Sequence, residues 1–262
     1  MEMDKGRVEV EDVVIRFGTR DSAVTALDRT NLVLEPGTFT ALIGPSGCGK
    51  STLMNAIAGF VQPAEGRITL DGAQIRGPSP DVGVIFQQYA LFPWFTALGN
   101  IRFGLKQFGF SKREEIDRAR AALDEVGLGA HAEKYPQQLS GGMKQRVAIA
   151  RTFATGAKVL LMDEPFGALD AMTRETLNLE LLRIWRESQK TVLFVTHSIS
   201  EAIFLSDRVV ALTPRPGKVA DTLSVNLPRP RRLETIQTQE FGRLAKHIRS
   251  LLGIGEEAGG IE

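Results

Sequence analysis

Short apolar runs alternate with longer amphipathic stretches along most of the chain. Three of these runs, at residues 39–43, 159–163 and 191–196, consist mainly of apolar and β-branched residues and are predicted to be buried strands. Helices are predicted at residues 50–58, 140–155, 171–188 and 198–205. This alternation is typical of an α/β protein with a mostly parallel sheet.

The first third of the chain has a different pattern. Strands are predicted at residues 8–17 and 31–34, joined by a polar turn around residues 18–22, and again at residues 67–70 and 82–86.

The middle of the chain is predicted to be helical, from residue 98 to residue 134. Four apolar residues there recur at a spacing that places them on one helix face: Ile116, Ala119, Leu123 and Val126. With the helix at 140–155, this region gives a helical subdomain of about residues 88–155. Farther along, residues 208–213 and 218–223 are predicted to form a hairpin.

The C-terminal tail begins with the segment Pro228-Arg-Pro-Arg-Arg232, whose prolines and charges predict a linker. The boundary of the main domain is therefore expected near residue 227. One more amphipathic helix is predicted from four apolar residues, Phe241, Leu244, Ile248 and Leu251. The last ten residues, 253–262, are rich in glycine and glutamate and are expected to be frayed.

Composition excludes several classes of protein. Of 262 residues, 43% are hydrophobic and 24% are charged, which excludes a disordered or collagen-like chain. The net charge of +1 gives no global attraction to nucleic acid or an anionic bilayer. The single cysteine fits a reducing compartment. No apolar run approaches the ~18–20 residues of a membrane span, and residues 1–10 lack the apolar core of a secretory signal.

Residues 44–51, with the sequence GPSGCGKS, match the phosphate-loop pattern between a predicted strand and a predicted helix. Glycines let several backbone N–H groups point at one anion, and the helix start adds its positive end. Lys50 is predicted to contact the β- and γ-phosphates, and Ser51 to bind Mg²⁺. A catalytic role for the Cys48 thiol is the alternative chemistry here. The expected nucleotide-binding residues are Gly44, Pro45, Ser46, Gly47, Cys48, Gly49, Lys50, Ser51 and Thr52.

Two carboxylates, Asp163 and Glu164, come at the end of the predicted strand 159–163. Ligands of open α/β sheets bind at the carboxyl ends of strands. Asp163 is therefore expected to hold Mg²⁺ through water, and Glu164 to act as the general base on an attacking water. The alternative is a strand that simply stops at a polar turn.

A second anion-binding helix start is predicted at Ser140. This residue is a good N-cap, and the two glycines after it leave their N–H groups accessible. One domain does not need two such helix starts for one triphosphate. We therefore expect a homodimer packed head to tail, with ATP between the phosphate loop of one copy and Ser140, Gly141 and Gly142 of the other.

With these motifs, the chain resembles the ATP-binding subunits of ABC transporters over about residues 8–225. The resemblance implies a P-loop NTPase (RecA-like) core with an N-terminal antiparallel β-subdomain and a helical subdomain. It also implies that Phe17 stacks on adenine and that Gln87 contacts Mg²⁺ and water. Asp170 would lie in the loop that crosses the dimer interface, and His197 beside the γ-phosphate. A core role for Phe17, and Gln88 in place of Gln87, are the alternatives.

Finer motifs are similar to a bacterial branch that imports nitrate, sulfonates and taurine: Phe92-Pro-Trp94, residues 163–174, Thr196-His-Ser198 and Arg215-Pro-Gly217. The resemblance implies an ATPase that uses ATP and Mg²⁺ to power uptake of a small anionic solute. Its partners would be a second copy, a separate permease that docks near the aromatic residues 89–98, and indirectly an extracytoplasmic solute-binding protein. The expected location is peripheral, at the cytoplasmic face of the inner membrane.

The main alternative function is a non-transport ABC ATPase that acts on DNA or ribosomes. DNA-repair members insert long coiled coils between the positions of Gln87 and Ser140, which are only 53 positions apart here. Ribosome-linked members usually carry two cassettes in one chain. A P-loop kinase or GTPase would not need the Ser140 segment, and no N-K-x-D motif is present. Nucleic acid is therefore not an expected partner.

Overall fold

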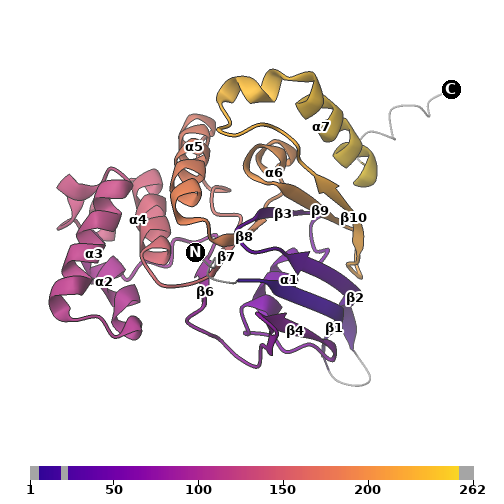
Figure 1. The fold of residues 1–262 in the computed structure, drawn as a ribbon, viewed down its shortest axis with the longest axis horizontal. Coiled ribbons are helices and arrows are strands. Elements are labelled where there is room, and N and C mark those ends of the chain that lie inside the picture. The colour runs from indigo at the N-terminus through magenta and orange to yellow at the C-terminus, as the bar shows by residue number, and fades with distance from the viewer. Residues whose placement is uncertain (1–5, 19–22, 254–262) are drawn as a thin grey trace. The chain divides into compact units, whose positions relative to one another are not determined.

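The computed structural model describes residues 6–18 and 23–253, which are drawn in colour in Figure 1. They fall into two compact units. The first unit combines the described parts of Met1–Pro78 and Thr191–Glu262, and the second is Ser79–Lys190. Most of the turn expected at 18–22, and the frayed end expected after Gly253, lie outside the described residues.

An antiparallel sheet forms one part of the first unit. Its strands are β1 (Val8–Phe17), β2 (Val24–Leu34), β4 (Glu65–Leu70) and β5 (Ala73–Gln74), in the order β2-β1-β4-β5. Strand β2 begins seven residues before the predicted strand. The pairing of β1 with β2 is interrupted by irregularities, and both Ala26 and Leu27 are buried, so the alternation that marks a strand is lost there.

Parallel strands form the other part of the first unit. Strand β3 (Phe39–Ile43) pairs in parallel with β8 (Thr191–Val195) and with β9 (Arg208–Leu212). Strand β10 (Val219–Ser224) is antiparallel to β9, which confirms the predicted hairpin. Strands β3 and β8 are buried along their whole length, as their apolar runs predict.

Three helices complete the first unit. Helix α1 (Lys50–Ile57) follows β3, and α6 (Ile199–Leu205) follows β8. Helix α7 (Gln239–Leu251) packs against α6. Its residues Phe241, Leu244 and Ile248 are buried, whereas Leu251 is exposed.

The second unit contains a parallel strand pair and four helices. Strands β6 (Val82–Ile85) and β7 (Val159–Asp163) pair in parallel. Helices α2 (Ala97–Leu105), α3 (Lys112–Glu125) and α4 (Gly141–Phe153) pack on one another (Figure 1), and α5 (Ala171–Ser188) has the predicted bounds.

The helical region predicted at 98–134 is interrupted after α2. Gly109 has a φ of 72°, and Ser111 then opens α3 with a capping box to Glu114. Ala119, Leu123 and Val126 are buried as predicted, and Ile116 is half-buried. The predicted α/β fold class is thus confirmed. No helix in the described part of the chain is long and apolar enough to cross a membrane.

Candidate functional site

The phosphate loop lies in the first unit between β3 and α1. Gly47 and Gly49 have φ values of 74° and 102°, which other residues rarely adopt. Helix α1 begins directly after its N-cap Gly49, which has no side chain to cap it, and the N–H groups at a helix start attract anions. The Lys50 Nζ atom donates hydrogen bonds to the carbonyl oxygens of Gly44 and Pro45 at 2.8 and 3.0 Å. The loop therefore concentrates positive potential where phosphate oxygens would bind.

The Cys48 thiol is fully buried beneath the loop. A built Cβ on Gly44 would lie 2.7 Å from its Sγ atom, so the sulfur packs against the loop backbone. A buried cysteine behaves as a small apolar residue, and a nucleophilic thiol requires exposure. The geometry does not support the alternative of a catalytic cysteine.

The loop between β9 and β10 supports the phosphate loop from outside. Gly217 donates to the carbonyl of Ala26 at 2.9 Å and accepts from the Asp28 N–H at 3.1 Å. A Cβ built on Gly217 would lie only 2.0 Å from the Cys48 carbonyl oxygen. Residue 217 must therefore be glycine for the two loops to pack this closely.

Two of the predicted catalytic side chains converge in the second unit. Glu164 follows β7 and has a φ of 42°, which is uncommon for a residue with a side chain. A Cβ built on Gly167 would lie 3.6 Å from Glu164 Oε2 and 3.7 Å from Gln87 Nε2, so both side chains point toward the same position. This arrangement places a carboxylate and an amide together, beside the end of the strand that carries Asp163. The Gln87 side chain is thus beside Glu164, and the choice of Gln87 over Gln88 stays a prediction.

The Ser140 helix start is packed beside the N-terminus of α5. Ser140 is exposed, and its hydroxyl caps α4 by accepting from the Met143 N–H at 3.3 Å. A Cβ on Gly141 would lie 3.0 Å from the Tyr89 hydroxyl, and one on Gly142 would lie 2.9 Å from the Thr173 side chain. The two glycines thus allow close packing at this helix start.

Asp170 has a structural role that the sequence did not predict. Its carboxylate caps α5 by accepting from the Thr173 N–H at 3.0 Å and from the Thr173 hydroxyl at 2.7 Å. These hydrogen bonds lower the pKa of Asp170, and the bond from the Thr173 hydroxyl has the largest effect. Because Thr173 also contacts Gly142, the Asp170 loop and the Ser140 helix are joined within one unit.

His197 is exposed at the end of β8, in a backbone segment that is held on both sides. The Thr196 hydroxyl donates to Glu201 Oε2 at 2.6 Å and accepts from the Ser198 N–H at 3.0 Å. The Ser198 hydroxyl in turn accepts from the Glu201 N–H at 3.3 Å, which caps α6. Thr196, Ser198 and Glu201 therefore fix the backbone from which the His197 side chain projects.

The predicted site residues divide between the two units. The first unit holds the phosphate-loop residues, His197 and Phe17, whose side chain is 46% exposed at the end of β1. That exposure is inconsistent with Phe17 as a core residue. The second unit holds Gln87, Asp163, Glu164, Ser140, Gly141, Gly142 and Asp170.

No group of three or more metal-binding side chains of the His, Cys, Asp or Glu type occurs among the described residues. Mg²⁺ sites in proteins usually take one or two carboxylates together with phosphate oxygens and water. Ser51 of the first unit, and Gln87 and Asp163 of the second, each carry an oxygen donor of the kind that Mg²⁺ prefers.

Comparison with known proteins decides the family. Residues 27–167 match the protein family described as ABC transporter. The chain belongs to the ABC transporter family of ATP-binding proteins. As an ABC ATPase it binds and hydrolyses ATP, and the family resemblance inferred from the sequence motifs is confirmed.

Individual relatives of this ABC ATPase extend over nearly its whole length. The nitrate import ATP-binding protein of Synechocystis sp. is 45% identical over 251 residues, covering 94% of each chain. The taurine import ATP-binding protein of Rhizobium johnstonii is 44% identical over 257 residues, covering 95% of this chain and 98% of that one. A solved ATP-binding cassette, dimeric with ADP and phosphate, is 33% identical with a TM-score of 0.74, covering 84% of this chain and 99% of the other.

Sequence reasoning missed the hydrogen bonds that support the ABC motifs, although it named Asp170 itself as a site residue. Thr196, Glu201 and Asp170 act through local hydrogen bonds, and only the spacing of capping residues could have indicated them. Arg151 of α4 donates to the carbonyl oxygens of Tyr89 and Ala90, at 3.5 and 2.8 Å, and so ties the segment after Gln87 to the Ser140 helix. No periodic pattern marks this contact.

Substituting Gly217 by alanine is predicted to weaken ATP binding. The added methyl would push against the Cys48 carbonyl and displace the phosphate loop, and such overpacking costs about 1–3 kcal/mol. We expect the Kd for ATP to rise roughly tenfold or more, since each ~1.4 kcal/mol is a factor of ten. Calorimetric titration with ATP measures this change.

Gly242→Ala is the matched control, because a Cβ on Gly242 in α7 would contact nothing described outside the backbone of its own helix. Equal ATP affinities for the two variants would show that the contact between Gly217 and Cys48 does not shape the phosphate loop.

Proposed function

We propose that this ABC ATPase powers the import of a small anionic solute through a separate permease. The observation that carries the catalytic part is the convergence of Glu164 and Gln87 beside the end of β7, in a chain that also carries an intact phosphate loop. The nitrate and taurine relatives support the solute class. The choice between such anions would be made by the permease and an extracytoplasmic solute-binding protein, which this ATPase reaches only indirectly.

Nucleotide binding is assigned to residues of the first unit. The ring of Phe17 stacks on adenine, and residues 44–52 surround the triphosphate with backbone N–H groups. Lys50 contributes its positive charge to the β- and γ-phosphates. Its side chain is buried, which directs the ammonium group into the loop. Ser51, Gln87 and Asp163 would hold Mg²⁺, which neutralises phosphate charge when it is bound.

Hydrolysis is assigned to Glu164 as the general base. Its carboxylate takes a proton from water while the water oxygen forms a bond to the γ-phosphorus and the bond to the bridging oxygen of ADP breaks. Gln87 orients the same water, because its amide lies against the same position as the carboxylate. His197 contacts the γ-phosphate from its fixed backbone segment.

A second copy of the chain completes each nucleotide site. Ser140, Gly141 and Gly142 present a helix start that serves no triphosphate within their own chain, and Asp170 lies in the adjoining loop. Support comes from the similar cassette that was solved as a dimer with ADP and phosphate. In this proposal the two copies close on ATP and separate after hydrolysis, and the permease follows that motion.

The permease is proposed to dock on an aromatic cluster of the second unit, formed by Phe92, Trp94, Phe95 and Phe103. Trp94 is 66% exposed, and the rings of Phe92 and Phe103 have centroids 4.5 Å apart. The buried Asn100 side chain fixes the turn beneath them by bonding the backbone of Phe92, Phe95 and Thr96. A rigid, exposed aromatic surface suits a protein partner. Through it the ATPase would sit peripherally at the cytoplasmic face of the membrane.

Glu164→Gln is predicted to retain ATP binding and to lose turnover by about 10²–10⁴-fold, the usual contribution of a general base. The amide keeps the size and shape of the carboxylate but cannot accept the proton. Steady-state phosphate release and ATP titration separate the two effects. Glu133→Gln, which changes an exposed carboxylate of the same unit, is the control. Wild-type turnover in Glu164→Gln would refute the assignment.

Trp94→Ala is predicted to abolish co-purification with the permease while basal ATPase activity stays unchanged. The substitution removes the most exposed ring of the cluster and leaves both helix starts intact. Pull-down of the membrane subunit from detergent extracts tests this. Phe60→Ala, another exposed aromatic, is the control. Full recovery of the permease with Trp94→Ala would place the docking surface elsewhere.

A further inference from the structure

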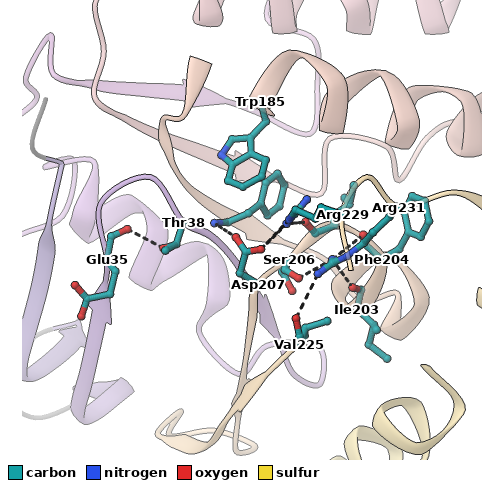
Figure 2. Close-up of polar contacts among 12 residues, drawn as sticks. Glu35, Thr38, Trp185, Ile203, Phe204, Ser206, Asp207, Val225, Arg229 and Arg231 are labelled. Carbon is teal, nitrogen blue, oxygen red and sulfur yellow. Dashed lines mark hydrogen bonds and ion pairs between the residues drawn. The ribbon is translucent and has the colours of Figure 1, made fainter. Parts of the chain in front are cut away.

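The segment predicted as a linker after residue 227 is bound to the C-terminal end of α6 through Arg231. This arginine is only 4% exposed. Its Nη1 atom donates to the carbonyl oxygens of Ile203, Phe204 and Ser206 at 2.9, 2.9 and 2.7 Å, and its Nη2 atom donates to that of Val225 at 3.4 Å (Figure 2).

These contacts stabilise an end of α6 that the helix cannot stabilise alone. The last carbonyl groups of any helix lack intrahelical partners, and a cation near them interacts favourably with the helix dipole. Helix α6 has only seven residues, a length that is marginal without outside contacts. Burial lowers the pKa of Arg231 to about 10, so the guanidinium remains charged at neutral pH.

Arg229 holds the same segment to the start of β3. Its guanidinium donates to the Leu205 carbonyl at 2.9 Å and to Asp207 Oδ1 at 2.6 Å. The other oxygen of Asp207 accepts from the Phe39 N–H at 2.9 Å, at the first residue of the strand that leads to the phosphate loop. The segment is thus joined to α6, which follows His197 in the chain, and to β3, which leads to the phosphate loop.

The opposite end of α6 lies next to His197. Helix α6 follows its N-cap Ser198, and Glu201 in its first turn accepts a hydrogen bond from the Thr196 hydroxyl. A shift of this short helix would therefore move Ser198 and Glu201, and with them the backbone on both sides of His197.

We propose that Arg231 is a positioning residue for hydrolysis, which holds α6 from its C-terminal end and thereby fixes His197 at the other end. This inference rests on the proposed role of His197. Residues 228–232 would then be part of the catalytic unit, because they determine where the histidine side chain projects.

Arg231→Ala is predicted to lower kcat about tenfold, within the range of interaction energies between coupled residues, and to leave the Kd for ATP unchanged. Arg231→Lys should recover part of the activity, because it keeps the positive charge but not the planar fork of donors. Arg232→Ala, which changes an exposed neighbour, should behave as wild type. An unchanged kcat for Arg231→Ala would overturn the inference, even if its melting temperature falls.

A double-mutant cycle distinguishes a route through His197 from a general loss of structure. If Arg231 acts through His197, then His197→Ala with Arg231→Ala should turn over ATP at the rate of His197→Ala alone. A further tenfold loss in the double variant would overturn the inference. Wild-type turnover in His197→Ala would instead refute the proposed role of the histidine.

Hydrogen exchange provides a readout that does not depend on activity. In Arg231→Ala and Arg231→Lys, the amides of residues 196–205 should exchange faster than in wild type, whereas the amides of β1 should not change. Unchanged exchange at residues 196–198 in both variants would show that the contact at the C-terminal end of α6 does not reach the histidine.

Discussion

The backbone of Gly217 packs closely against the Cys48 carbonyl, and this contact shapes the phosphate loop that ATP binding requires. A triphosphate is bound mainly by N–H groups that must already point inward, because reorienting them during binding would cost free energy. Here the fully buried β3 fixes one end of the loop, α1 fixes the other, and Gly217 packs against the Cys48 carbonyl from outside. The turns with positive φ at Gly47 and Gly49 are held between these supports.

The second unit presents its reactive groups in a comparable way. Glu164 and Gln87 converge on Gly167, while Ser140 and Asp170 each cap a helix and are joined through Thr173. Side chains that are fixed by hydrogen bonds and packing lose little entropy when a substrate arrives, which is how positioning lowers a reaction barrier. The same argument applies to His197, because hydrogen bonds of the Thr196 hydroxyl to Glu201 and Ser198 fix the backbone on both sides of it.

The sequence predicted the elements that carry the chemistry better than the contacts that support them. Strand 39–43, helix 171–188 and the hairpin of β9 and β10 follow from local apolar patterns, and the phosphate loop follows from fixed residue types at fixed spacing. The first half of β2 was missed because irregular pairing with β1 disturbs its alternation. The contacts of Gly217, Arg151 and Arg231 join residues that are far apart in the sequence. A local sequence pattern does not indicate such contacts.

The ATP affinity of Lys50→Ala, measured by calorimetric titration, tests the central claim about the phosphate loop most directly. Losing the buried ammonium group removes charge-assisted hydrogen bonds worth about 1.5–3 kcal/mol, so the account predicts a Kd roughly 10- to 100-fold higher than that of wild type. A variant that folds normally and binds ATP with wild-type affinity would contradict the account.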